Sequence, residues 1–325
     1  MDIQAIANDI LIDAINKRVS DIFIMPAIDK YLVKFRLKEN VQEFKKVDYA
    51  LGRELLNYYK FISQMDIAEH RRPQVGSLIK EVAKKRYFLR LSCIGNFNDQ
   101  ESLVIRVIYG MQENRYFLPE QLEQLELLAK RRGMIVTSGP TGSGKTSTMY
   151  QVAHSISCNK MVMTIEDPVE IWEETFLQTQ VNNVAAITYS DLLKAALRHR
   201  PDILIIGEIR DSQTAKLAVN AALSGHLVLA TVHAKSTFQT LSRLEGLGVR
   251  QDELANSLTA ISYQRLLLNQ DRQLSCILDI ASGKQLRDEI FNSERGNFIS
   301  WKNNLTYLKK QGQIDEVTFN DYQEG

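Results

Sequence analysis

A glycine-rich segment in the middle of the chain carries the residue types that bind phosphate. Residues 139–146 read GPTGSGKT, which satisfies the pattern G-x-x-x-x-G-K-[ST]. Glycines let successive backbone N–H groups turn toward phosphate oxygens, and a following helix adds the positive end of its dipole. We therefore expect a nucleotide-binding loop made of Gly139, Pro140, Thr141, Gly142, Ser143, Gly144, Lys145, Thr146 and Ser147.

The elements on both sides of this loop decide whether the pattern is meaningful. The apolar stretch 134–138 predicts a strand, and apolar residues at helical spacing predict a helix over 145–156. A strand, a glycine loop and a helix in this order form a P-loop. In such a loop, we expect Lys145 to contact the β and γ phosphates of ATP and the Thr146 hydroxyl to bind Mg²⁺.

A second candidate for chemistry is an acid at the end of an apolar strand. Residues 203–206 read ILII and are followed by Gly207 and Glu208. Ligands of open α/β sheets bind at the carboxyl ends of the strands, so we expect Glu208 to activate the attacking water. The alternative is a surface charge without a catalytic role. Because Gly207 stands where a metal-supporting aspartate often precedes the glutamate, Mg²⁺ is expected to rely on Thr146, phosphate and water.

Further acids follow another predicted strand, 161–165. Glu166, Asp167 and Glu170 are close in sequence and would gather negative charge near a Mg²⁺–phosphate site. There they could hold metal-bound water or tune Glu208. The alternative is an exposed acidic turn before Pro168.

Two histidines bracket the predicted strand 227–232. His226 precedes it and His233 follows it, and seven residues of extended chain separate them by roughly 23 Å. The two imidazoles therefore cannot contact the same phosphate.

The elements that must position these residues fall into two groups. Over residues 1–108 we expect a small α+β domain with helices at 3–18 and 49–61 and strands at 21–25, 31–37, 86–93 and 102–108. Residues 109–118 are expected to link it to a second domain, 119–325. There short apolar strands alternate with amphipathic helices, which predicts an α/β fold with a mostly parallel sheet covered on both faces. A helical extension is expected near the end, over 301–310.

Composition limits the classes of protein that fit. The chain has 325 residues, 44% of them hydrophobic, and a net charge of +1, so a strong overall attraction for nucleic acid is not expected. Three cysteines without CxxC spacing suggest neither a disulfide framework nor a zinc site. We see no signal peptide and no apolar stretch of the roughly 20 residues that a membrane span requires. A cytoplasmic protein is expected, with any membrane role exercised through partners.

Four stretches together resemble the Walker A, Asp box, Walker B and His box of the type II/IV secretion ATPases. They occur in the family's order: GPTGSGKTSTMY (139–150), MTIEDPVE (163–170), ALRHRPDILIIGEIRD (196–211) and AALSGHLVLATVHAKST (221–237). The resemblance implies a RecA-like P-loop ATPase domain behind a smaller, PAS-like N-terminal domain. It also implies ATP and Mg²⁺ as cofactors and a ring of six copies of the chain.

The resemblance assigns further roles. His233 would sense the γ-phosphate, and Glu166 would join the catalytic acids. VSDIFIMP (19–26) is similar to the N-terminal signature of these motors. Arg90 and Arg106 lie where the family's N-terminal domain supplies arginines to the nucleotide; without the resemblance they would be taken for solvated strand residues.

Departures from the family pattern narrow the role. Phe23 and Met25 replace the histidine and glutamate of the signature, and we see neither a four-cysteine zinc insertion nor a further N-terminal domain. A short, zinc-free form resembles the ATPase that assembles the competence pseudopilus of Gram-positive bacteria for DNA uptake. That resemblance implies a polytopic membrane platform protein as partner, at the cytoplasmic face of the membrane. The alternatives are a pilus retraction motor, a type IV secretion traffic ATPase, a RecA-type DNA motor and a nucleotide-dependent scaffold.

Overall fold

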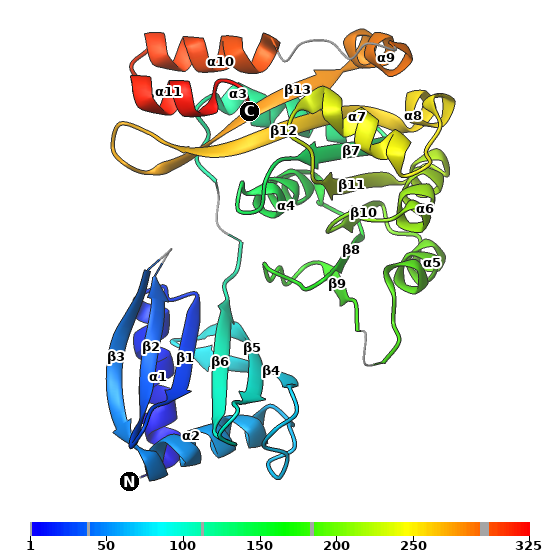
Figure 1. Ribbon diagram of the computed structural model, residues 1–325. Helices are drawn as coiled ribbons and strands as arrows, with labels where there is room; N and C mark the ends of the chain where they lie inside the picture. Colours follow the sequence, from blue (N-terminus) through cyan, green and yellow to red (C-terminus); the bar gives the residue numbers. More distant parts are fainter. Residues whose placement is uncertain (1, 38–39, 112–113, 183–184, 293–298) are drawn as a thin grey trace. The chain divides into compact units, whose positions relative to one another are not determined.

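The computed structural model describes residues 2–37, 40–111, 114–182, 185–292 and 299–325. The chain divides into two compact units, Met1–Gly110 and Met111–Gly325 (Figure 1). Each unit has its own hydrophobic core.

The N-terminal unit is built on a six-stranded antiparallel sheet with the order β3-β2-β1-β6-β5-β4. Its strands are β1 (Asp21–Pro26), β2 (Lys30–Leu37), β3 (Asn40–Asp48), β4 (Gln74–Val82), β5 (Lys85–Gly95) and β6 (Glu101–Ile108). The four strands predicted from the sequence correspond to β1, β2, β5 and β6. Strands β3 and β4 were not predicted, because most of their side chains are polar or exposed edge positions.

Two helices, α1 (Ile3–Asn16) and α2 (Tyr49–Ile62), supply the rest of this unit's core. Each begins after an aspartate whose side chain accepts a backbone N–H of the first turn: Asp2 for α1 and Asp48 for α2. The apolar stripe of α1 is buried in the same cluster as Ile22 and Ile24 of β1. Both predicted helices are confirmed.

The C-terminal unit contains a seven-stranded mixed sheet with the order β13-β12-β7-β11-β10-β8-β9. Its strands are β7 (Gly133–Ser138), β8 (Val162–Glu166), β9 (Leu177–Gln180), β10 (Ile203–Ile206), β11 (Leu227–Val232), β12 (Leu258–Leu268) and β13 (Leu274–Ser282). Every neighbouring pair is parallel except β12 and β13, which form an antiparallel hairpin. The predicted mostly parallel sheet is confirmed.

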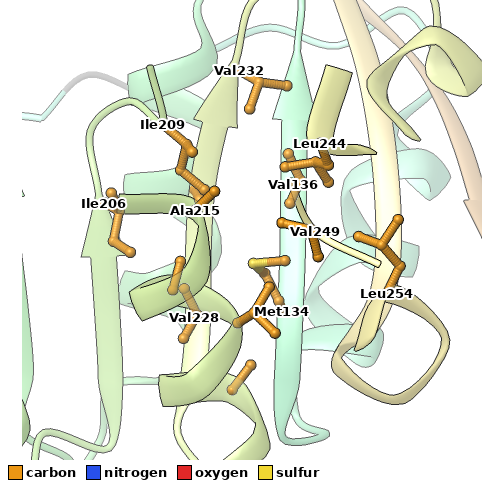
Figure 2. Close-up of a cluster of buried hydrophobic side chains, with 14 of the residues drawn as sticks. Met134, Val136, Ile206, Ile209, Ala215, Val228, Val232, Leu244, Val249 and Leu254 are labelled. Carbon is orange, nitrogen blue, oxygen red and sulfur yellow. The ribbon is translucent and has the colours of Figure 1, made fainter. Parts of the chain in front are cut away.

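Helices cover both faces of this sheet, as the uninterrupted apolar strands require. Alternate strand residues such as Met134, Val136 and Val228 pack against helices on one face (Figure 2). Ile135, between the first two, packs against helices on the other face. The first face carries α5 (Tyr189–His199), α6 (Ser212–Leu223), α7 (Thr237–Gly246), α8 (Gln251–Ser257) and α9 (Gly283–Phe291). The second face carries α3 (Pro119–Ala129) and α4 (Lys145–Ile156).

The C-terminal end of the chain packs on the β12–β13 hairpin. Helices α10 (Ile299–Lys310) and α11 (Glu316–Tyr322) lie along it (Figure 1). Trp301 is fully buried there against Tyr263, with the rings edge to face and 5.1 Å between their centroids. The predicted helix over 301–310 is confirmed, whereas the hairpin that supports it was not predicted.

The segment before α3 is attached to the C-terminal unit. Phe117 N donates to Cys276 O at 2.9 Å, and Cys276 N donates to Arg115 O at 2.6 Å. Residues 115–117, expected in a linker, therefore pair with β13. None of the described helices combines the length and the hydropathy needed to cross a bilayer.

Candidate functional site

Four adjacent parallel strands bring the predicted site residues to one edge of the sheet. The loop 139–144 follows β7, Glu166 ends β8, Glu208 follows β10 and His233 follows β11. Because β7, β11, β10 and β8 are neighbours and run in the same direction, their carboxyl ends meet. There they surround a cavity of about 600 Å³. The site residues predicted from the sequence that line this cavity are Thr141, Gly142, Gly144, Lys145, Thr146, Ser147, Glu166, Glu208 and His233.

The glycine loop adopts a backbone that few other residues tolerate. Gly139, Gly142 and Gly144 have φ values of 145°, 78° and 83°. At Gly139 a Cβ atom would stand 2.4 Å from the carbonyl oxygen of Gln264, so β12 backs the loop closely. At Gly142 nothing lies within 4 Å of that position, so the backbone is open to the cavity.

Three loop residues shape the site from behind. Gly139 and Pro140 present their carbonyl oxygens to the Lys145 Nζ, at 2.9 and 2.8 Å. Ser143 is buried, and its carbonyl accepts a hydrogen bond from the Gln264 side chain. None of these three lines the cavity, although the sequence placed them among the binding residues.

Lys145 opens α4 and brings a cation into the cavity. Burial lowers the pKa of its amine, and the nearby carboxylates of Glu208 and Glu170 act in the opposite direction. The amine is held only by carbonyl dipoles, which an anionic phosphate would outcompete. A half-buried cation of this kind can bind a negatively charged ligand.

Thr146 contacts Glu170, an acid to which the sequence analysis gave no individual role. Its hydroxyl donates to Glu170 Oε2 at 3.0 Å. Both side chains line the cavity, which makes them a pair of oxygen donors at one point of the wall. Glu170, rather than Glu166, is the acid that contacts the predicted metal ligand.

Glu166 occupies a more enclosed position. Its side chain is only 2% exposed, and its Oε1 accepts hydrogen bonds from Tyr150 at 2.5 Å and Thr164 at 2.7 Å. Burial raises the pKa of this carboxyl above its ordinary value, although the two hydrogen bonds favour the charged form. The three acids of this segment therefore differ in solvent exposure: Glu166 is buried, whereas Asp167 and Glu170 are exposed.

Glu208 is held from two sides. Its Oε2 accepts from Arg210 Nε at 2.7 Å, and its Oε1 lies 3.4 Å from His233 Nε2. The hydrogen bond to Glu208 raises the pKa of Arg210, which also lies 3.7 Å from Asp167. The side chain of Glu208 is 17% exposed, so its carboxylate remains accessible within the cavity.

The backbone beneath Glu208 is fixed by both neighbouring strands. Gly207 N donates to Ile165 O of β8 at 2.8 Å, and the Thr231 hydroxyl of β11 donates to Gly207 O at 2.5 Å. Ile209 N then donates to Thr231 O. A Cβ at Gly207 would stand 3.3 Å from the Glu166 Cα, a tight contact that the glycine avoids.

The two histidines occupy opposite ends of β11. His226 Nδ1 lies 2.7 Å from the carbonyl oxygen of Pro201, before the strand, whereas His233 lies beside Glu208 after it. Only His233 lines the cavity. The sequence-based statement that the two cannot share a phosphate agrees with this geometry.

Arg90 and Arg106 lie side by side in the N-terminal unit. They are direct partners in the β5–β6 register. Arg106 Nε donates to Asp21 Oδ1 at 2.8 Å, and the Arg106 side chain is 60% exposed. Asp21 also lies 3.8 Å from Arg36. This one carboxylate of β1 therefore forms ion pairs with arginines of both neighbouring strands, β2 and β6.

A family model described as type II/IV secretion system protein matches residues 2–297. The chain belongs to this family. The family predicted from the four sequence boxes is confirmed.

Individual relatives of this secretion protein place it in the competence branch. It is 40% identical over 315 residues to competence protein ComGA of Streptococcus pneumoniae, covering 97% of this chain and 96% of that protein. It is 38% identical over 272 residues to ComGA of Bacillus subtilis, covering 82% and 76%. Type II secretion system protein E of Klebsiella pneumoniae is 36% identical over 267 residues, 80% of this chain and 54% of that protein. The predicted resemblance to Gram-positive competence proteins is confirmed.

Solved structures share the fold at low identity. The pilus retraction motor PilT with bound ADP has a TM-score of 0.78 and 23% identity, covering 97% of this chain and 96% of that chain. The Legionella pneumophila ATPase DotB has a TM-score of 0.75 and 18% identity, covering 97% and 94%. The secretion protein therefore has the α/β fold of these ATPases, with an N-terminal antiparallel sheet and a C-terminal mixed sheet.

One residue of the secretion protein's site escaped the sequence analysis. Gln264 of β12 is fully buried, and its Nε2 donates to Ser143 O at 2.6 Å, beneath the glycine loop. Its Oε1 and the Ser143 hydroxyl are both buried without a hydrogen-bond partner among the described residues. In the sequence Gln264 is one of several polar residues within 258–268, so nothing there singled it out.

The donors present suit a nucleoside triphosphate with a magnesium ion. The open backbone at Gly142, the cation of Lys145 and the first-turn N–H groups of α4 face a cavity of suitable size. Thr146 and Glu170 offer the oxygen ligands that Mg²⁺ prefers. Within the described residues there is no cluster of three or more His, Cys, Asp or Glu side chains fit for a metal. Mg²⁺ would therefore depend on phosphate and water for its remaining ligands.

Proposed function

We propose that this protein is an ATP-hydrolysing motor that powers assembly of a competence-type pseudopilus for DNA uptake. Its similarity to ComGA over nearly the whole chain supports the biological role. The convergence of Lys145, Glu208 and His233 around one cavity supports the chemistry. That convergence is the observation on which the proposal most depends.

In this proposal residues 119–325 form a RecA-like P-loop ATPase domain. Residues 1–108 form a PAS-like partner domain, and 109–118 connect the two. Alternation of parallel strands with helices, and a phosphate loop between β7 and α4, favour the RecA-like assignment.

The binding step uses the loop and the first turn of α4. Lys145 exchanges its carbonyl partners for the β and γ phosphates, and the exposed backbone of Gly142 and Gly144 approaches phosphate oxygens. Thr146 and Glu170 would hold Mg²⁺, which would neutralise charge on the phosphates.

The hydrolytic step uses Glu208. Its carboxylate accepts the proton of the attacking water, while Arg210 and His233 keep it oriented toward the cavity. In this proposal His233 also senses the γ-phosphate, and its position in the same cavity wall as Glu208 supports that role. Glu166 supports this wall from inside through Tyr150 and Thr164.

The remaining parts of the proposal concern assembly. Arg90 and Arg106 act as arginine fingers that neutralise charge on the transferring phosphoryl group. The motor works as a homohexamer at the cytoplasmic face of the membrane, and its motion is passed to a polytopic platform protein. No direct nucleic-acid contact is part of this function.

The deciding experiment replaces the chromosomal gene with one encoding Glu208→Gln and measures two quantities in the same strain. ATP hydrolysis by the purified variant and transformation by added DNA should both be lost, together with assembled pseudopili. Wild-type transformation in that strain would contradict the proposal. An excess of surface pili would instead assign the protein to retraction, and stimulation of wild-type hydrolysis by DNA would indicate a DNA motor.

A further inference from the structure

The edge of the C-terminal sheet opposite the nucleotide cavity is strongly basic. The segments leading into three of the parallel strands each bring a cation there: Arg131 and Arg132 before β7, Lys160 before β8 and Arg200 before β10. Since β7 and β11 each have six residues, this edge lies about 20 Å from the nucleotide cavity. It therefore belongs to a different functional surface.

Two hollows on this edge share the same pair of arginines. One, of about 330 Å³, is lined by Lys130, Lys160 and Arg200 as well as Arg131 and Arg132. The other, of about 470 Å³, is lined by both arginines together with cations of α9. Seven lysine and arginine side chains line these two hollows, and we call six of them the basic edge: Arg131, Arg132, Lys160, Arg200, Lys284 and Arg287.

In the part of the chain that the structure describes, positive charge predominates around the two hollows. No ion pair within 4.0 Å joins any of its six side chains to an acid in the parts of the chain that the structure describes. Asp202, the one acid lining either hollow, accepts a hydrogen bond from Met161 N at 2.9 Å. Unpaired cations around a concave surface favour an anionic ligand.

The backbone makes room for one of these arginines. Gly225 has a φ of 94°, and a Cβ there would stand 3.0 Å from Arg132 Nη1. The guanidinium therefore lies against the glycine, in the turn between α6 and β11. Arg132 is exposed, and its side chain lines both hollows.

The larger hollow also has an apolar floor. Ala255 of α8 and Leu258 at the start of β12 lie half-buried, and Leu286 and Ile290 of α9 are buried. Guanidinium groups bind carboxylates with two parallel hydrogen bonds, and an apolar floor accepts an aliphatic side chain. The combination fits a segment that carries both.

We propose that the basic edge binds an acidic segment of a partner protein, with an apolar residue of that segment in the hollow beside α9. Nucleic acid is a poorer match because no Phe, Tyr or Trp lines either hollow to stack a base. A flat membrane surface is a poorer match because the cations surround hollows between turns and helix ends. This binding does not depend on ATP hydrolysis.

The test uses a fluorescent peptide in which pairs of glutamates alternate with single leucines, and the full-length protein. Fluorescence anisotropy should show binding that weakens as salt rises. The double substitution Arg131→Glu, Arg132→Glu should weaken binding at least tenfold and leave ATP hydrolysis unchanged. The double substitution Arg131→Gln, Arg132→Gln should cause a smaller loss of peptide affinity. It replaces the glutamate variant in the test if the charge reversal impairs folding.

A matched control reverses two charges of another basic cluster. Lys85→Glu, Arg86→Glu changes the net charge equally in the N-terminal unit and should leave peptide affinity unchanged. If both double variants weaken peptide binding equally, the loss reflects only the change in net charge, and the proposal is overturned. The proposal is also overturned if the Arg131 and Arg132 substitutions leave peptide binding unchanged.

Parallel titrations separate other occupants. A single-stranded oligonucleotide and vesicles containing an anionic phospholipid should bind more weakly than the peptide. If either binds more tightly and loses binding in the Arg131 and Arg132 variants, the surface serves that ligand and the proposal is wrong. If these variants change the oligomeric state, the basic edge is a contact between copies of the chain, which also overturns it.

Discussion

Glu208 Oε1 lies 3.4 Å from His233 Nε2, although 24 residues separate the two along the chain. They meet because they follow β10 and β11, which are parallel neighbours. Arg210 binds the other oxygen of the same carboxylate. Glu208 is thus oriented by groups from two loops before any substrate arrives.

Replacing Glu208 with Gln should lower kcat for ATP hydrolysis by about 10²-fold or more, because the amide cannot accept the proton of water. ATP binding should survive, since the amide keeps the shape of the side chain. Steady-state kinetics and equilibrium binding of a fluorescent ATP analogue check both statements. The control is Glu174→Gln, an exposed acid outside the cavity. Unchanged kcat in Glu208→Gln would move the base elsewhere.

Lys145→Ala should abolish measurable turnover and weaken ATP binding, because the cavity loses the cation that meets the phosphates. The loop carbonyls of Gly139 and Pro140 would also lose their donor. Isothermal titration with ATP and Mg²⁺ measures the binding. Lys194→Ala removes an exposed lysine of α5 and should behave as the wild type. A Lys145→Ala protein that hydrolyses ATP normally would disprove the site.

Gln264→Met should raise KM for ATP several-fold while changing kcat less. The substitution keeps the volume of the side chain but removes the hydrogen bond that fixes Ser143 O under the loop. Leaving a buried carbonyl without its donor costs about 1–3 kcal/mol, part of which loosens the loop. Kinetics at varied ATP, together with thermal unfolding, separate loop positioning from global stability. The exposed Gln285→Met is the control. A loss of stability with unaltered KM would make Gln264 purely structural.

The stability of the protein should depend on pH through Glu166. Burial raises its pKa in the folded protein above the unfolded value of about 4.5, so the folded state keeps a proton that the unfolded state releases. The stability contributed by this group therefore decreases as pH rises from that value through the folded pKa.

Glu166→Gln removes the titration but keeps an oxygen for Tyr150 and Thr164. Its melting temperature should exceed that of the wild type by a few degrees at pH 8, and the difference should vanish below pH 4. Differential scanning calorimetry across this range measures it. A variant less stable than the wild type at pH 8 would show that the charged carboxylate is favoured.

The sequence was most informative where function depends on neighbouring residues. The loop from Gly139 to Thr146, the strand before it and the helix after it are all local, and the structure matches their predicted bounds closely. Likewise, the prediction that Glu208 lies in the site requires only that the apolar run before it forms a strand whose carboxyl end meets those of its parallel neighbours. The α/β fold with its two-part organisation followed from the change of pattern near residue 119.

The sequence was least informative where function depends on distant pairing. Spacing alone could not show that Glu170 reaches Thr146 whereas Glu166 turns inward to Tyr150. The strand β12 is parallel to β7, and its mixed polar and apolar residues do not alternate in the regular way that would have predicted a strand. Gln264 could not be recognised for the same reason.

The hydrogen bond between Gln264 and Ser143 spans 121 residues, which sets an order of events during synthesis. A ribosome adding 5–20 residues per second completes β12 roughly 6–24 s after the glycine loop. Through that interval the nascent chain carries a phosphate loop without the strand that backs it. A stalled or truncated product ending before β12 should therefore bind nucleotide poorly, which keeps unfinished subunits from competing with complete ones for ATP.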